Sequence, residues 1–205
     1  MSDFNLATLI VGLLSLSGVV VNICVTMIAD KKRRYTGLIT THRISSMKAA
    51  ETLFSKIIGN MYSFRIPSTD KVAEFKAFEL NKQEVLYLIG QEGSPEEEIR
   101  QVLSDIDRFL FYSSVEKTEL TREQQHRYYD ILKVGIDCLQ NLTRAYAKCE
   151  WEKCKHTSTY GSESKFDKAK ILNNFYIKDK EKVDEQMKFL HENDFDSVLN
   201  WKKKK

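Results

Sequence analysis

The sequence predicts an all-α protein: a single N-terminal transmembrane helix followed by a cytoplasmic antiparallel helical bundle. Three observations lead to this fold class. Residues 4 to 29 form an uncharged stretch of 26 residues. The remaining chain repeats apolar residues at helical spacing and contains no alternating strand pattern of any length. Only two Pro and eight Gly occur among 205 residues, which leaves few interruptions to long helices.

The uncharged stretch is long enough to cross a bilayer. Of its 26 residues 18 are apolar, and at 1.5 Å rise per residue it extends over roughly 39 Å, against a hydrocarbon core of roughly 30 Å. The alternative is a secretory signal peptide, which needs a basic segment before a shorter apolar run. Residues 1 to 3 contain no basic residue. The sequence therefore predicts a transmembrane helix at 4 to 29, with 1 to 3 as a short extracytoplasmic N-terminus.

The orientation follows from the basic juxtamembrane segment at 30 to 39. Lys31, Lys32, Arg33 and Arg34 come directly after the uncharged stretch, and the other flank has no Lys or Arg. Because positive charge is retained on the cytoplasmic side, we expect an inner (plasma) membrane protein with its N-terminus outside and its C-terminus in the cytoplasm.

Basic charge is concentrated at the two ends of the chain. The net charge is +3, and it becomes −5 when Lys31 to Arg34 and the terminal Lys202, Lys203, Lys204 and Lys205 are set aside. Two terminal clusters suit anionic lipid headgroups, whereas a nucleic-acid binder usually carries its positive charge across a domain face. We therefore expect membrane lipids as partners and predict no specific nucleic acid.

Residues 40 to 192 are predicted to form the bundle. Ser94, with Pro95 and Glu97 after it, predicts one capped helix start, and Thr121 with Gln124 predicts a second capping box. Gly135 lies inside the longest predicted helix, where it either admits a close neighbour or lowers stability. The predicted helices cover residues 40 to 62, 72 to 89, 95 to 110, 122 to 156, 166 to 176 and 180 to 191.

The tail at 193 to 205 combines apolar and aromatic residues with four lysines. Phe195, Val198, Leu199 and Trp201 precede Lys202. This composition is typical of a segment that inserts at the headgroup boundary of a membrane. The alternative is a disordered, solvated C-terminus, because so short a segment has few contacts to offset its ordering entropy.

Cysteines and one histidine form the most ligand-like group in the sequence. Cys149, Cys154 and His156 lie close together, with Cys138 upstream. A closed zinc site needs four convergent ligands, but Cys154 is rotated about 140° away from Cys149 on a helix. Cys138 and Cys149 share one apolar face instead, as small buried hydrophobes do. We expect no metal and no other cofactor.

Arg122 and His126 form a polar pair at the start of the longest predicted helix. The pair resembles the Arg–spacer–His motif of the HEPN ribonucleases, an all-α family, although three residues separate the two here and at least four do in that family. The resemblance covers five residues and would imply ribonuclease activity. The simpler interpretation is an exposed pair on one helix face, and no catalytic residue is assigned.

Small and polar residues recur along one stripe of the predicted transmembrane helix. Gly12, Ser15 and Asn22 are its central members, and such a stripe permits close helix packing with an amide hydrogen bond across a homo-oligomer. The alternative is a span that tolerates these residues without associating. The full stripe consists of Thr8, Gly12, Ser15, Val19, Asn22 and Thr26.

Three functions fit the sequence. The leading hypothesis is a non-enzymatic single-pass membrane protein whose cytoplasmic helical bundle makes protein contacts, with itself or with another protein, at the inner membrane. The second is a membrane-acting effector of a phage-defence or toxin system that works by oligomerisation of its span. The third is a membrane-tethered hydrolase or nuclease whose site carries no motif in the sequence.

Overall fold

The structure is a computed structural model that describes residues 2–66, 70–90, 93–115, 119–160 and 166–201, without the side chains of residues 2–10, 12–14, 16, 35, 175, 177 and 178. Within these ranges the chain forms α-helices and no strand, which confirms the all-α prediction. The helices are α1 (Ser2–Ser63), α2 (Lys71–Leu88), α3 (Glu96–Val115), α4 (Arg122–Tyr160), α5 (Lys168–Glu192) and α6 (Phe195–Leu199).

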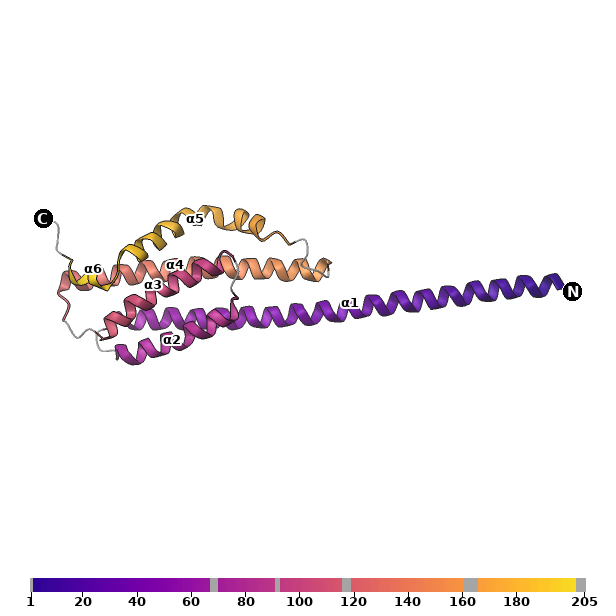
Figure 1. Cartoon of the computed structure of the whole chain (residues 1–205), viewed down its shortest axis with the longest axis horizontal. Helices are drawn as coiled ribbons and strands as arrows, with labels where there is room; N and C mark the ends of the chain where they lie inside the picture. The colour runs from indigo at the N-terminus through magenta and orange to yellow at the C-terminus, as the bar shows by residue number, and fades with distance from the viewer. Residues whose placement is uncertain (1, 67–69, 91–92, 116–118, 161–165, 202–205) are drawn as a thin grey trace.

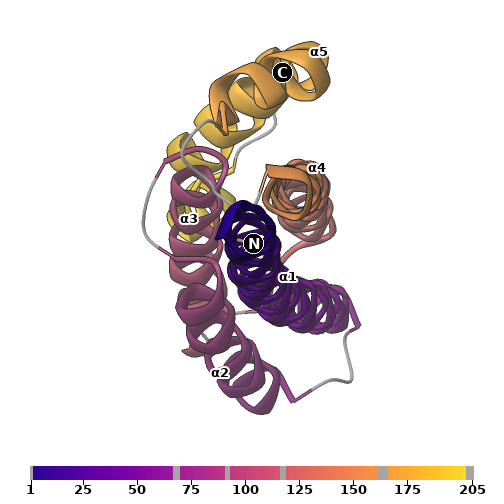
Figure 2. The same cartoon turned by 90° about the vertical axis from the view of Figure 1, so that its right-hand side faces the viewer.

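Successive long helices run in opposite directions, so the bundle is antiparallel (Figure 1). α1 packs against α2 and α4, while α4 also contacts α3, α5 and α6. Viewed along the long axis, α4 lies between α1 and α5 (Figure 2). α4 is therefore the central helix, and its buried side chains form a stripe at helical spacing that includes Tyr128, Leu132, Ile136, Leu139, Leu142, Tyr146 and Cys149.

α1 is one continuous helix of 62 residues. The predicted division into a juxtamembrane segment at 30 to 39 and a helix from residue 40 is wrong in this respect. Gly37 is the one glycine there, and one Gly in a helix costs about 1 kcal/mol, too little to interrupt a helix that continues on both sides. The second half of α1 packs into the bundle through Met47, Ala50, Phe54, Ile57 and Met61, whereas the first half projects alone (Figure 1).

Gly135 marks a close approach of α4 to α1 and α3. A Cβ atom at this position would lie 3.3 Å from Cδ1 of Ile106 on α3 and 3.3 Å from Cε of Met61 on α1. Contacts this short are tighter than ordinary van der Waals packing. Of the two predicted roles for Gly135, the structure therefore shows the close approach.

The helix starts confirm one predicted capping box and correct the other. The Thr121 N–H donates to Gln124 Oε1 at 2.9 Å, and the Gln124 N–H donates to Thr121 Oγ1 at 3.3 Å, as predicted. At α3, however, the Ser94 hydroxyl donates to Glu98 Oε2 at 2.8 Å. The Glu97 N–H donates instead to the carbonyl of Gly93 at 2.9 Å, because a backbone turn already forms there.

The C-terminal third differs from the prediction in two ways. α5 is a single helix rather than two, because no Gly or Pro interrupts residues 168 to 192. The tail up to Trp201 is folded: Phe195 and Val198 are buried in the core. These two side chains are thus neither disordered nor available to insert into a membrane.

Candidate membrane interface

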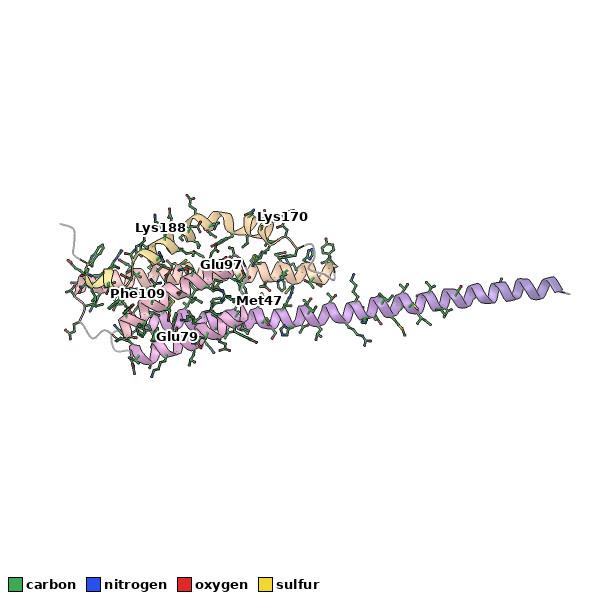
Figure 3. All side chains as sticks on the ribbon, in the orientation of Figure 1. Met47, Glu79, Glu97, Phe109, Lys170 and Lys188 are labelled. Carbon is green, nitrogen blue, oxygen red and sulfur yellow. The ribbon has the colours of Figure 1, made fainter. Side chains whose placement is uncertain are left out.

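The projecting half of α1 exposes apolar side chains in all directions. Every described side chain from residue 17 to 34 is exposed. The exposed fraction reaches 57% for Val19, 60% for Val25 and 69% for Ile28. Figure 3 shows these side chains radiating from α1 beyond the end of the bundle, with no other helix beside them. The bundle itself leaves this surface uncovered.

Among the described residues, no helix has a segment both long enough and apolar enough to cross a bilayer. The span expected from the sequence at 4 to 29 includes many residues whose side chains lie outside the described ones, among them Gly12. Four members of the predicted stripe are described, Ser15, Val19, Asn22 and Thr26, and all four are exposed.

Lys31 to Arg34, which we name the basic collar, lies where the bundle begins. All four side chains are exposed. The last turns of α4 run beside the next turns of α1: Arg43 Nη1 donates to Thr157 Oγ1 at 3.4 Å, and the two helices line a shared groove. The collar therefore separates the projecting apolar half of α1 from the packed half.

The C-terminal segment lies at the opposite end of the bundle (Figure 1). Trp201 packs on Arg127, near the start of α4, whereas the groove beside the collar includes Ser158, near the end of α4. The 31 residues between positions 127 and 158 separate the two ends by about 46 Å along the helix. Trp201 therefore lies at the end of the bundle far from the projecting half of α1, and the membrane contact expected for this tail stays a prediction. Lys202 to Lys205 lie outside the described residues.

Cys138, Cys149 and Cys154 are buried in the bundle. Burial raises the pKa of the Cys138 thiol to about 12 and that of Cys149 to about 11, so both remain protonated at neutral pH. His156 packs against the rings of Tyr160, at 4.7 Å between centroids, and Phe166, at 5.7 Å. Within the described residues no three His, Cys, Asp or Glu side chains come together in a way that could hold a metal ion.

Arg122 and His126 are both exposed on the first turns of α4. This arrangement agrees with the interpretation as a surface pair. Within the part of the chain that the structure describes, neither side chain has a ring contact or ion pair that would orient it as a catalytic group requires.

Two charged clusters were not predicted from the sequence. Lys168 Nζ on α5 lies 2.6 Å from Oε2 of the buried Glu96 on α3. Further along α3, Asp107 pairs with Lys82 of α2 at 3.0 Å, and Lys82 also pairs with Glu79 of its own helix. The sequence pattern shows only that Glu96 begins a helix, since the partner is 72 residues away. Both clusters join neighbouring helices, and neither faces the projecting half of α1.

Comparison of the chain with protein-family models, with curated proteins and with solved structures gives no significant match.

Proposed function

We propose that this chain is a single-pass inner-membrane protein whose cytoplasmic bundle makes protein contacts at the membrane surface. One observation carries the anchoring: the half of α1 that leaves the bundle exposes large apolar side chains in several directions, and the basic collar lies at the boundary. Covering the seven exposed Val, Ile and Met side chains from Val19 to Ile28 is worth on the order of 10 kcal/mol. A helix that stands alone in water leaves these side chains exposed and does not gain this free energy.

A bilayer covers this surface better than a second helix would. A coiled-coil partner buries only one seam of a helix, with apolar residues at two of every seven positions. Val19, Val20 and Val21 point in three directions about 100° apart, and all three are exposed. Lipid contacts all of these directions at once. The collar then orients the helix, with the bundle on the cytoplasmic side.

The outer face of α2 supports protein contact. α2 buries Phe78 and Val85 against the bundle, yet Leu80 is 70% exposed and Tyr87 is 87% exposed on another face. Large apolar side chains gathered on a surface helix are typical of interaction sites. Val72, 48% exposed, lies on the same stripe.

Inducible expression tests the proposal against its two alternatives. The full chain and a chain that starts at residue 35 are compared for growth, membrane potential and recovery in the membrane fraction. The proposal predicts that only the full chain is recovered with membranes and that neither version dissipates the potential. Loss of potential that requires the span would support a membrane-acting effector, and toxicity of the shorter chain would support an enzyme.

Site-specific photocrosslinking tests the contact surface. A photoreactive residue at Leu80 or Tyr87 is expected to crosslink to one discrete protein in cells, whereas the same residue at Lys133, an exposed position on α4, serves as the control. Equal and diffuse crosslinking at all three positions would show that α2 has no dedicated partner.

A further inference from the structure

A groove of about 550 Å³ lies between α1 and the end of α4, directly beside the basic collar. α1 contributes Lys32, Arg33 and Thr36, and α4 contributes Ser158 and Thr159. Among the nine described residues that line the groove none is acidic, although 30% of all residues in the chain are charged. Its volume falls within the range of roughly 300 to 1,000 Å³ that is usual for ligand sites.

The lining has the chemistry of a phosphate site. Arg33 presents a guanidinium fork that matches phosphate oxygens, and Lys32 adds a second full positive charge. The hydroxyl groups of Thr36 on α1 and Ser158 on α4 can donate hydrogen bonds to the remaining oxygens, whereas the Thr159 hydroxyl already donates to the Lys155 carbonyl at 3.0 Å. Another hydroxyl, Oγ1 of Thr40, is buried in the lining and has no hydrogen-bond partner in the described structure. A buried hydroxyl without a partner is uncommon and indicates an unfilled polar contact.

One electrostatic effect opposes an anion here. The C-terminal end of a helix carries partial negative charge, equivalent to about half an elementary charge, and α4 ends at Tyr160 beside the groove. Two full positive charges from Lys32 and Arg33 outweigh it. The balance therefore favours a negatively charged ligand.

The position of the groove indicates where the phosphate comes from. Lys32 and Arg33 follow Ala29, the last residue of the uncharged stretch at 4 to 29, by about 5 Å along the helix. The headgroup layer on each side of a bilayer is about 5 to 8 Å deep. We propose that the groove binds one phosphate group, presented by the headgroup of an anionic lipid. The lipid source rests on the proposed membrane anchoring, whereas the phosphate chemistry does not.

The chain itself offers a charge-matched control. On α1, Lys32 and Arg33 line the groove, while Lys31 and Arg34 point about 120° to 180° away from its centre. The double substitution Lys32→Gln with Arg33→Gln removes the same charge as Lys31→Gln with Arg34→Gln, but only the first pair lines the groove. Gly37→Leu provides a third variant: Gly37 lines the groove and a Cβ there meets no atom within 4 Å, so the larger side chain fills space without changing charge.

The test is a titration of the full chain in detergent micelles with phosphatidylglycerol, followed by native mass spectrometry. Diacylglycerol with the same acyl chains is the phosphate-free control, and circular dichroism verifies folding of each variant. The groove pair is expected to lower phosphatidylglycerol affinity about tenfold or more, and the control pair less than about threefold. Gly37→Leu is expected to weaken binding as the groove pair does. Equal losses in the two charge pairs, or equal affinity for diacylglycerol, would overturn the site.

Two further experiments distinguish a lipid headgroup from free phosphate as the ligand. Displacement of phosphatidylglycerol by excess inorganic phosphate would support the phosphate group as the contact, and binding of inorganic phosphate without any phosphatidylglycerol binding would overturn the lipid. Alkaline extraction of membranes from cells that produce the full chain reports the anchoring separately. A chain that is extracted refutes the proposed function, while the micelle affinities still decide whether the groove binds phosphate.

Discussion

The guanidinium carbon of Arg127 lies 4.6 Å from the centre of the Trp201 ring and 4.9 Å from that of Phe189. The same side chain donates a hydrogen bond to Asn193 Oδ1. One residue of α4 thereby holds the end of α5 and the segment after α6. This contact fixes the C-terminus at the end of the bundle far from the collar.

Arg127→Ala is expected to release this segment and to lower the free energy of unfolding by about 2 kcal/mol. Two cation–π contacts contribute about 0.5 to 1 kcal/mol each, and the hydrogen bond contributes about 1 kcal/mol. Tryptophan fluorescence in a Trp151→Phe background reports Trp201 alone and should shift to longer wavelength. The control is Arg122→Ala, which removes an exposed Arg of the same helix and should change stability by less than about 0.5 kcal/mol. An unchanged emission spectrum for Arg127→Ala would contradict the contact.

Gly135 and Gly59 should respond in opposite ways to larger side chains. Gly135→Leu places atoms where Ile106 and Met61 already lie, so it should cost about 1 to 3 kcal/mol. Gly59 is an exposed helical residue at which a Cβ meets nothing within 4 Å, so Gly59→Ala should stabilise by about 0.5 to 1 kcal/mol. Chemical denaturation measures both, and a stabilising Gly135→Leu would show that the helices are not in close contact there.

Asp107 predicts a pH dependence of stability. Burial, together with its hydrogen bond with Glu79, raises the pKa of Asp107 to about 6 from an ordinary value of 3.8. Folding thus favours the protonated acid, and stability should fall as the pH rises through about 6. Asp107→Asn keeps this side chain neutral, so its melting temperature should exceed that of the parent at about pH 7.5 and approach it near pH 4, around the ordinary pKa of 3.8. Solvent reduces the gain to about 1 kcal/mol or less, because Asp107 is only half-buried.

The same substitution at Asp130, which is exposed on α4, is the matched control. Asp130→Asn should leave the difference in melting temperature between the two pH values as it is in the parent. A parent protein with equal or greater stability at the higher pH would contradict the assignment to Asp107.

Asn22 tests self-association of the span. Asn22→Leu is expected to weaken dimerisation of the span in a membrane reporter assay by roughly 0.6 to 2 kcal/mol, because other partners soften the loss of one intramembrane hydrogen bond. Val20→Leu, about 160° around the helix, should have little effect. Association that is absent in the parent, or equal in the two variants, would remove the case for the stripe as an interface.

Much of the fold was predictable because it rests on local signals. The stripe on α4 and the capping box at Thr121 follow from spacing and from hydrogen bonds within four residues, which the sequence displays directly. The division of α5 into two helices was wrong because no Gly or Pro enforces a break there. The predicted helix start at residue 40 was wrong for a similar reason, because Gly37 alone does not end a helix.

Contacts between distant segments could not be predicted in this way. The sequence of Trp201 followed by four lysines predicts a membrane-binding tail. Only the fold shows that Trp201 packs on Arg127, 74 residues earlier in the chain. The groove beside the collar likewise requires α4 to return alongside α1. The collar itself was visible in the sequence. Nothing in the sequence indicated that Ser158 and Thr159 would line the groove beside it.

The native cysteines offer the most direct measurement of membrane anchoring. Cys24 is exposed on the projecting half of α1, whereas Cys138, Cys149 and Cys154 are buried in the bundle. A membrane-impermeant maleimide added to intact cells should label Ser2→Cys from outside, should label Lys188→Cys only after permeabilisation, and should leave Cys24 unlabelled in both conditions. Labelling of Cys24 in membranes, or of Lys188→Cys in intact cells, would contradict a spanning α1 with a cytoplasmic bundle.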